Sequence, residues 1–250
     1  MNTPSQNRPV AAITGASSGI GREIARRLAA SGYDLAICAR RQERLADIGD
    51  DLRRQDIEVL TQTVDLRQEA QILDFFATIR ERWGQLDVLV NNAGLGHNAP
   101  LLTGDTAAWR ETLEVNVLAL SICTREAIKL MQASGDSGHI VHISSMSAHR
   151  VPGSGMYSAS KFAVRALTEG LRQELRSADS SIRVSSISPG YVETEFAEKY
   201  HQSADQAKAV YARFPVLQPA DIANAVVYAI SQPDYVQVHD ILLRPTQQVS

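Results

Sequence analysis

The sequence predicts a single doubly wound α/β domain, and three observations lead to that prediction. Short apolar runs alternate with longer stretches in which apolar residues recur at helical spacing. The apolar runs are continuous, which is typical of parallel strands that are covered by helices on both faces. The 250 residues show no internal repeat and no linker-like stretch, so one domain over residues 1–250 is expected.

The expected elements follow one another as strand and helix along the chain. The first strand stops at a glycine, and Ile20, Ile24 and Leu28 then recur on one face of a helix. Strands are expected at 10–14, 33–39, 57–64, 86–91, 139–144, 182–188 and 236–243. Helices are expected at 20–30, 41–54, 68–83, 106–131, 157–178 and 221–230, whereas residues 190–219 show no clear period.

Composition excludes several classes of protein. The 25 basic and 28 acidic residues give a net charge of −3, without the basic excess that is typical of nucleic-acid-binding proteins. No apolar run approaches the ~20 residues of a membrane span, and residues 1–9 lack the apolar core of a secretory signal. Two cysteines cannot form a disulfide framework. We therefore expect a cytoplasmic protein with a small-molecule substrate and neither a nucleic-acid nor a membrane partner.

A glycine-rich turn, TGASSGIG at 14–21, joins the first strand to the first helix. Glycines let a backbone approach a ligand closely, and the N-terminus of the following helix suits a pyrophosphate. The spacing differs from the more common G-x-G-x-x-G, so a tight turn without a ligand is the alternative. Because a strand precedes the turn and a helix follows it, we predict a dinucleotide site at Gly15, Ser17, Ser18, Gly19, Ile20 and Gly21.

The end of the second expected strand bears on the choice between NAD and NADP. An NAD site usually places a carboxylate about 20 residues beyond the glycines, where it binds the ribose hydroxyl. Here Arg40 and Arg41 follow the strand, and a guanidinium suits a 2′-phosphate. The alternative is that both arginines only solvate the next helix. We predict NADP(H) as the preferred cofactor, with NAD(H) as the alternative.

Three polar residues form a candidate catalytic group. Tyr157 and Lys161 are four residues apart in an expected helix and therefore share one face. A phenol needs its pKa lowered by roughly 3 units to act as a base near pH 7, and a nearby ammonium favours that change. Ser144 ends a strand, where its hydroxyl could hold a carbonyl. Asn116 lies on an apolar stripe, and taken alone it is better explained as a buried amide that satisfies a backbone group.

Together these residues resemble the short-chain dehydrogenase/reductase family. The resemblance spans nearly the whole chain and also includes NNAG at 91–94, YSASK at 157–161 and SPGYVET at 188–194. It implies a Rossmann-type sheet of seven parallel strands in the order 3-2-1-4-5-6-7. Residues 8–100 would mainly bind the dinucleotide, and residues 101–250 would carry catalysis, the substrate loop and the subunit contacts of a homodimer or homotetramer.

The resemblance also implies a role for each residue of the site. Tyr157 would donate the proton, Lys161 would bind the nicotinamide ribose and lower the pKa of the tyrosine, and Ser144 would orient the carbonyl. Asn116 would sustain a water-linked proton relay through Lys161. The other cofactor contacts that it implies are Asp65, Leu66, Asn92, Ala93, Gly94, Pro189, Gly190, Val192 and Thr194.

The predicted function is hydride transfer between NADP(H) and a carbonyl compound or a secondary alcohol, with no metal ion. The alternatives are a non-catalytic dinucleotide-binding sensor or scaffold and an NAD-dependent alcohol or 3-hydroxy acid dehydrogenase. The tail ILLRPTQQ resembles the branch that contains serine and 3-hydroxy acid dehydrogenases. An apolar substrate is favoured, and a charged one stays open because Arg150 could meet a carboxylate. The candidate apolar walls are Met146, Val151, Tyr191, Phe196, Tyr200 and Phe214.

The subunit contact is expected on the helices over 106–131 and 157–178. We expect their outward faces to carry apolar residues, with Ile122 and Ala166 as examples. A homotetramer formed through these faces is the hypothesis that the resemblance favours.

Overall fold

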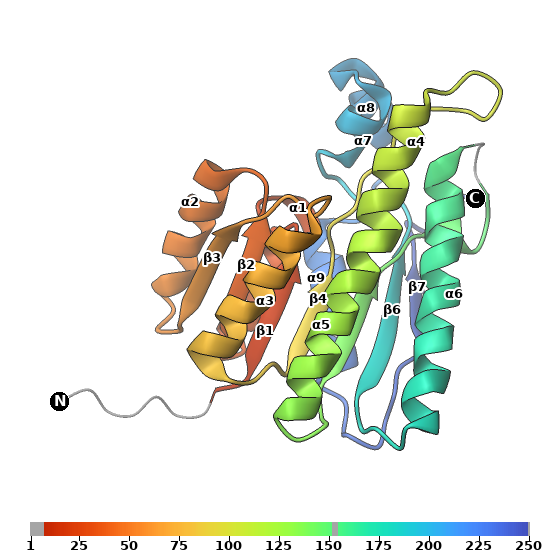
Figure 1. The fold of residues 1–250 in the computed structure, drawn as a ribbon. Coiled ribbons are helices and arrows are strands. Elements are labelled where there is room, and N and C mark those ends of the chain that lie inside the picture. Colours follow the sequence, from red (N-terminus) through yellow and green to blue (C-terminus); the bar gives the residue numbers. More distant parts are fainter. Residues whose placement is uncertain (1–7, 152–154, 250) are drawn as a thin grey trace.

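The computed structural model describes residues 8–151 and 155–249, and their strands form one seven-stranded sheet (Figure 1). The strand order is β3-β2-β1-β4-β5-β6-β7, and every neighbouring pair is parallel. The expected fold class and strand order are therefore confirmed. Residues 1–7, which belong to the expected polar arm, and residues 152–154 lie outside the described residues. The strands are β1 (Val10–Thr14), β2 (Asp34–Ala39), β3 (Val59–Thr63), β4 (Val88–Asn91), β5 (His139–Ile143), β6 (Arg183–Pro189) and β7 (Asp240–Leu243).

Helices cover both faces of the sheet. One apolar cluster joins the sheet to α1, α2 and α9, and a second cluster joins its other face to α3, α5 and α6. Both β1 and β2 are buried along their whole length, because each of their faces meets one of these clusters. The helices are α1 (Gly19–Ala30), α2 (Gln42–Arg53), α3 (Glu69–Trp83), α4 (Thr106–Leu113), α5 (Leu120–Ala133), α6 (Met156–Ser177), α7 (Phe196–His201), α8 (Ala204–Tyr211) and α9 (Pro219–Ile230).

The long helix expected over 106–131 is interrupted by a wide turn. Figure 1 shows α4 and α5 along one path, but the residues between them, Glu114–Ala119, form a π-helical turn. Such turns often occur at functional sites, and this one contains Asn116. Because the turn alters the helical phase, the residues of α5 are rotated relative to those of α4. Ile122 is only 8% exposed and belongs to the apolar cluster between the sheet and α3, α5 and α6. The expectation that Ile122 faces outward was wrong, whereas Ala166 is exposed on α6.

Two short helices occupy the stretch that shows no period in the sequence. Glu195 is the N-cap residue of α7, and the Ser203 hydroxyl caps α8 by accepting a hydrogen bond from the Gln206 backbone. Figure 1 shows both helices above the carboxyl ends of the strands. In parallel α/β sheets ligands bind at this edge, so α7 and α8 stand over the expected site. Within residues 8–151 and 155–249, every helix is too short or too polar to span a bilayer.

Candidate active site

One cavity of about 540 Å³ opens at the carboxyl ends of the strands. Most of the residues that the sequence singles out line it, although they come from loops far apart in the chain. Gly21 and Asn116 are the two site residues that do not line it. Those that do are Gly15, Ser17, Ser18, Gly19, Ile20, Arg40, Arg41, Asp65, Leu66, Asn92, Ala93, Gly94, Ser144, Tyr157, Lys161, Pro189, Gly190, Val192 and Thr194.

The glycine turn forms the floor of one end of the cavity. Gly19 has a φ of +53°, and a Cβ there would lie 3.1 Å from Cγ2 of Thr194, across the cavity. Gly21 serves packing, because a Cβ there would lie 2.4 Å from Nδ2 of Asn92. Ser18 is the N-cap residue of α1, but its side chain does not bond to the helix backbone. Ser18 therefore leaves the first N–H groups of α1 to other acceptors, and because Gly19 and Ile20 line the cavity an anion there could accept from them.

The opposite end contains the candidate catalytic group. Tyr157 and Lys161 lie one turn apart on α6, and Ser144 follows β5. Lys161 is 5% exposed; its Nζ donates to the backbone oxygen of Ile143 at 3.0 Å and lies 5.8 Å from the centre of the Tyr157 ring. Ser144 is 4% exposed, and its hydroxyl has no hydrogen-bond partner among the described residues. A buried hydroxyl without a partner is costly unless a ligand satisfies it.

Burial shifts the pKa values of Tyr157 and Lys161 in the directions that favour their neutral forms. It raises the pKa of Tyr157 to about 12, although a hydrogen bond with Ser145 lowers it and nearby Tyr200 raises it further. It lowers the pKa of Lys161 to about 8. Without a cofactor, the shift of Tyr157 is thus opposite to the one that the family resemblance implies. At neutral pH Tyr157 is a phenol, the form that donates a proton.

Asn116 holds the loop that follows β4 rather than facing the cavity. Its Oδ1 accepts a hydrogen bond from the Leu95 backbone nitrogen at 2.9 Å, and its Nδ2 donates to the Leu95 oxygen at 2.7 Å. The same Nδ2 donates to the Ser160 hydroxyl at 2.9 Å. A Cβ on Gly94 would lie 3.5 Å from both Asn116 Oδ1 and Lys161 Nζ. Asn116 therefore ties the glycine loop at 94–95 to α6, next to Lys161.

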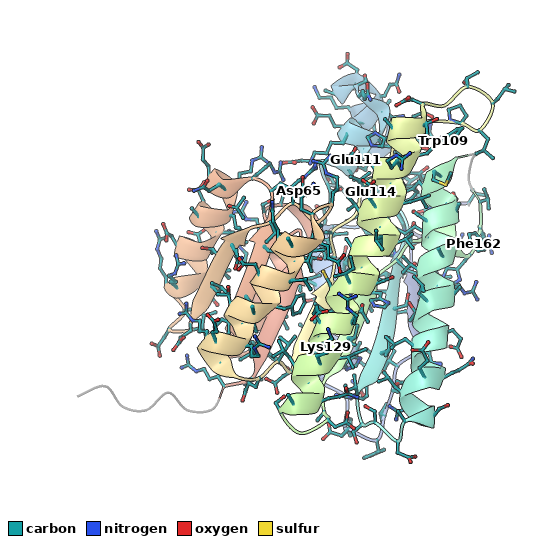
Figure 2. The ribbon with its side chains drawn as sticks, viewed as in Figure 1. Asp65, Trp109, Glu111, Glu114, Lys129 and Phe162 are labelled. Carbon is teal, nitrogen blue, oxygen red and sulfur yellow. The ribbon has the colours of Figure 1, made fainter. Side chains whose placement is uncertain are left out.

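Charged residues surround the glycine-turn end of the cavity. Arg41 donates to the hydroxyls of Ser17 and Ser18 at 3.3 and 2.6 Å and pairs with Glu195 at 2.7 Å. Arg40 pairs with Glu111 at 3.5 Å. Figure 2 shows Asp65 and Glu111 near this same upper edge, far from Lys129 on α5.

The carboxylate of Asp65 is held by a neighbouring arginine. A hydrogen bond from Arg67 lowers the pKa of Asp65. Arg67 also pairs with Glu111 at 3.3 Å, so one network joins the loop after β3 to α4. Sequence reasoning did not predict that Glu111 and Glu195 pair with arginines, because only the fold brings these residues together at this end.

Aromatic rings of α7 pack against the ring of Tyr157. The Phe196 ring centre lies 5.1 Å from that of Tyr157, and Tyr200 lies 5.9 Å from Phe196 in a stacked arrangement. Of the other residues expected here, Met146, Tyr191 and Arg150 line the cavity, whereas Val151 and Phe214 do not. Gln248 also lines it and accepts a hydrogen bond from the Tyr191 backbone nitrogen at 3.0 Å. Gln248 ends the tail ILLRPTQQ, which the sequence did not predict to reach the cavity.

Comparison with known proteins agrees with this geometry. The profile of the family described as short chain dehydrogenase matches residues 9–205. The dehydrogenase/reductase SDR family member 11 of Bos taurus is 45% identical over 248 residues, covering 96% of this chain and 97% of its own. The farnesol dehydrogenase of Aedes aegypti is 39% identical, over 94% and 95% of the two chains. A closed form of serine dehydrogenase, solved with NADP+, has a TM-score of 0.89, 30% identity and 96% coverage of both chains.

Proposed function

The chain belongs to the short-chain dehydrogenase family, and we propose that it transfers a hydride between NADP(H) and a carbonyl group or secondary alcohol, with Tyr157 as acid and base. The observation that carries this proposal is the partnerless hydroxyl of Ser144 in a cavity that also contains Tyr157 and Lys161. A substrate oxygen would satisfy that hydroxyl.

The residues present fit a bound dinucleotide. The missing Cβ of Gly19 and the N-terminus of α1, which no side chain of Ser18 caps, suit a pyrophosphate. Arg41 with Ser17 and Ser18 offers donors for a 2′-phosphate. Asp65, Asn92 and Thr194 would line the rest of the cofactor. NADP(H) would supply the hydride when bound. The serine dehydrogenase solved with NADP+ supports this choice over NAD(H).

Each catalytic side chain has a distinct task in this proposal. Tyr157 donates its phenolic proton to the carbonyl oxygen in reduction and takes a proton back in oxidation. Ser144 donates a hydrogen bond to the same oxygen and so stabilises its developing charge. The ammonium of Lys161, when charged, favours the phenolate that remains after the transfer. Asn116 acts as a positioning residue, because it holds the loop at 94–95 beside Lys161.

The wall of the cavity favours an apolar substrate. Phe196 and Tyr200 stack on each other and contact the Tyr157 ring at a tilt and edge-on, and Met146 adds further apolar surface. Lys199, the cation on the same short helix, is paired with Glu195 at 3.4 Å. Arg150 also lines the cavity and could meet a carboxylate, but the surface beside Tyr157 is apolar, so a ketone, aldehyde or alcohol on an apolar molecule fits better than a small acid.

A homodimer or homotetramer is part of the proposal. Apolar side chains lie partly exposed on neighbouring helices: Leu113 and Phe162, the latter labelled on α6 in Figure 2, are each 40% exposed, and Leu118 is 57% exposed. A second copy would bury them. A sedimentation experiment that gives only a monomer would exclude it.

The function is tested by changing Tyr157→Phe and measuring NADPH binding and turnover on a panel of apolar ketones. Loss of the proton donor should lower turnover by about 10²- to 10⁴-fold and leave NADPH binding unchanged. Tyr228→Phe, which removes an exposed hydroxyl on α9, is the matched control and should keep full turnover. Tight NADPH binding without turnover in the wild type would support a sensor instead. Equal binding of NADH would support the NAD-dependent alternative.

A further inference from the structure

Glu195 connects two parts of the molecule that are far apart in the sequence. It precedes α7, the short helix whose rings cover Tyr157, and it contacts two arginines at the start of α2. Oε2 accepts a hydrogen bond from Nη1 of Arg41 at 2.7 Å, and Oε1 accepts one from Arg44. Among the described residues it is the carboxylate that forms an ion pair with Arg41.

The charges around Glu195 are unbalanced. Three cations, Arg41, Arg44 and Lys199, surround this single carboxylate. Burial alone would raise the pKa of Glu195, but the hydrogen bonds from the two arginines outweigh it and lower the pKa to about 2. Glu195 is therefore ionised at every pH at which the protein would work. Its negative charge is a permanent part of this end of the cavity.

A 2′-phosphate and the Glu195 carboxylate need the same donors. Arg41 lines the cavity, and its other nitrogen, Nη2, is held by the hydroxyls of Ser17 and Ser18. The Nη1 atom of Arg41 already donates to Glu195. A phosphate with a charge of about −2 that binds Arg41 would also lie close to the negative carboxylate of Glu195. NAD(H) carries a hydroxyl in place of that phosphate and does not meet this repulsion.

We propose that Glu195 is a specificity-determining residue that weakens the preference for NADP(H) over NAD(H), because its carboxylate competes with the 2′-phosphate for Arg41 and Arg44. The inference rests on the proposed use of NADP(H). It concerns the difference between the affinities for NADPH and for NADH. The group that repels the 2′-phosphate is the Glu195 carboxylate, which lies far from the arginines in the sequence.

The test is equilibrium binding of NADPH and of NADH to the full chain, measured separately by titration calorimetry for the wild type and Glu195→Gln. We expect the Kd for NADPH to fall at least about threefold in the variant, as for the loss of one half-exposed charge contact. The Kd for NADH should stay the same. The gain should shrink at high salt, because the affected charges are accessible to solvent.

The matched control is Glu198→Gln, which removes one negative charge from α7, three residues after Glu195. Glu198 is exposed, and none of its side-chain contacts involves Arg41 or Arg44. It should change neither Kd. Titration with adenosine 2′,5′-bisphosphate and with AMP repeats the comparison with ligands that lack the nicotinamide, so a disturbed α7 would not affect it.

Three results would overturn the inference. An equal change of both Kd values would mean that Glu195 only stabilises α7. An unchanged or weaker affinity for NADPH in Glu195→Gln would mean that Glu195 does not compete, or that it orients Arg41 for the phosphate. If the wild type binds neither dinucleotide, the proposed function fails before any variant is measured, and the inference fails with it.

Discussion

The two ends of the cavity are built on different physical principles. At the catalytic end, Lys161 and Ser144 are almost fully buried, and their close surroundings are backbone and neutral side chains. At the glycine-turn end, the proposed nucleotide end, the side chains of Arg40, Arg41 and Glu195 are 52%, 35% and 37% exposed and form ion pairs. Burial therefore sets the chemistry of the first end, and charge pairing sets that of the second. The catalytic end should resist salt, whereas the nucleotide end should respond to it.

The largest expected effect is at the catalytic end and concerns stability. Burial lowers the pKa of Lys161 from 10.5 to about 8, so the native state binds this proton less tightly than the unfolded chain. The cost of the buried charge is present below pH 8 and disappears as pH rises from about 8 to 10.5. Lys161→Met should remove a cost of about 3 kcal/mol at neutral pH.

The measurement is urea unfolding of the wild type and Lys161→Met between pH 7 and pH 10. The variant loses a hydrogen bond to Ile143, a cost that does not depend on pH, so the change with pH is the informative quantity. The stability of the wild type should rise relative to the variant over this range. A difference that stays constant would show that Lys161 is not desolvated, and the contrast between the two ends would then be lost.

An intermediate effect is expected at the glycine turn. A glycine can be required there for its left-handed backbone or for the space that a Cβ would fill, and two variants separate these requirements. Gly19 and Gly32 both have positive φ, +53° and +83°, but a Cβ at Gly32 would meet nothing within 4 Å. Changing either to Ala should cost about 1 kcal/mol of stability, because of the left-handed backbone. Only Gly19→Ala should also weaken NADPH binding. Thermal unfolding and NADPH titration check both; equal binding in the two variants would place the cofactor elsewhere.

The same contrast explains how far the sequence could predict the site. The catalytic end follows from local patterns: Tyr157 and Lys161 share a helical face, and Ser144 directly follows a buried strand. The parallel sheet and its two helical layers follow from apolar runs and helical spacing along the chain, whereas the strand order was implied by the family resemblance; the structure confirms both. The runs and the spacing depend on residues that are close in sequence or on a regular period.

The features that sequence reasoning missed depend on contacts between distant residues. Glu195 binds Arg41, which lies 154 residues earlier in the sequence, and Glu111 on α4 forms an ion pair with Arg40. The π-helical turn at Asn116 breaks the 3.6-residue period, so Ile122 was placed on the wrong side. The short helix α8 is capped by Ser203, and α7 is held by the aromatic contacts of Phe196 rather than by a repeating apolar face. No local pattern contains this information.

The smallest expected effect distinguishes the two arginines that the sequence treats as equivalent. Arg41 is held by two serine hydroxyls at the turn, whereas Arg40 is more exposed and bound to Glu111. Arg41→Ala should therefore weaken NADPH binding about fivefold, and Arg40→Ala only about twofold, with NADH unaffected in both. Parallel titrations of NADPH and NADH at low salt measure this. If Arg40→Ala has the larger effect, the 2′-phosphate lies on the α4 side, and Glu111 rather than Glu195 is the carboxylate that competes with it.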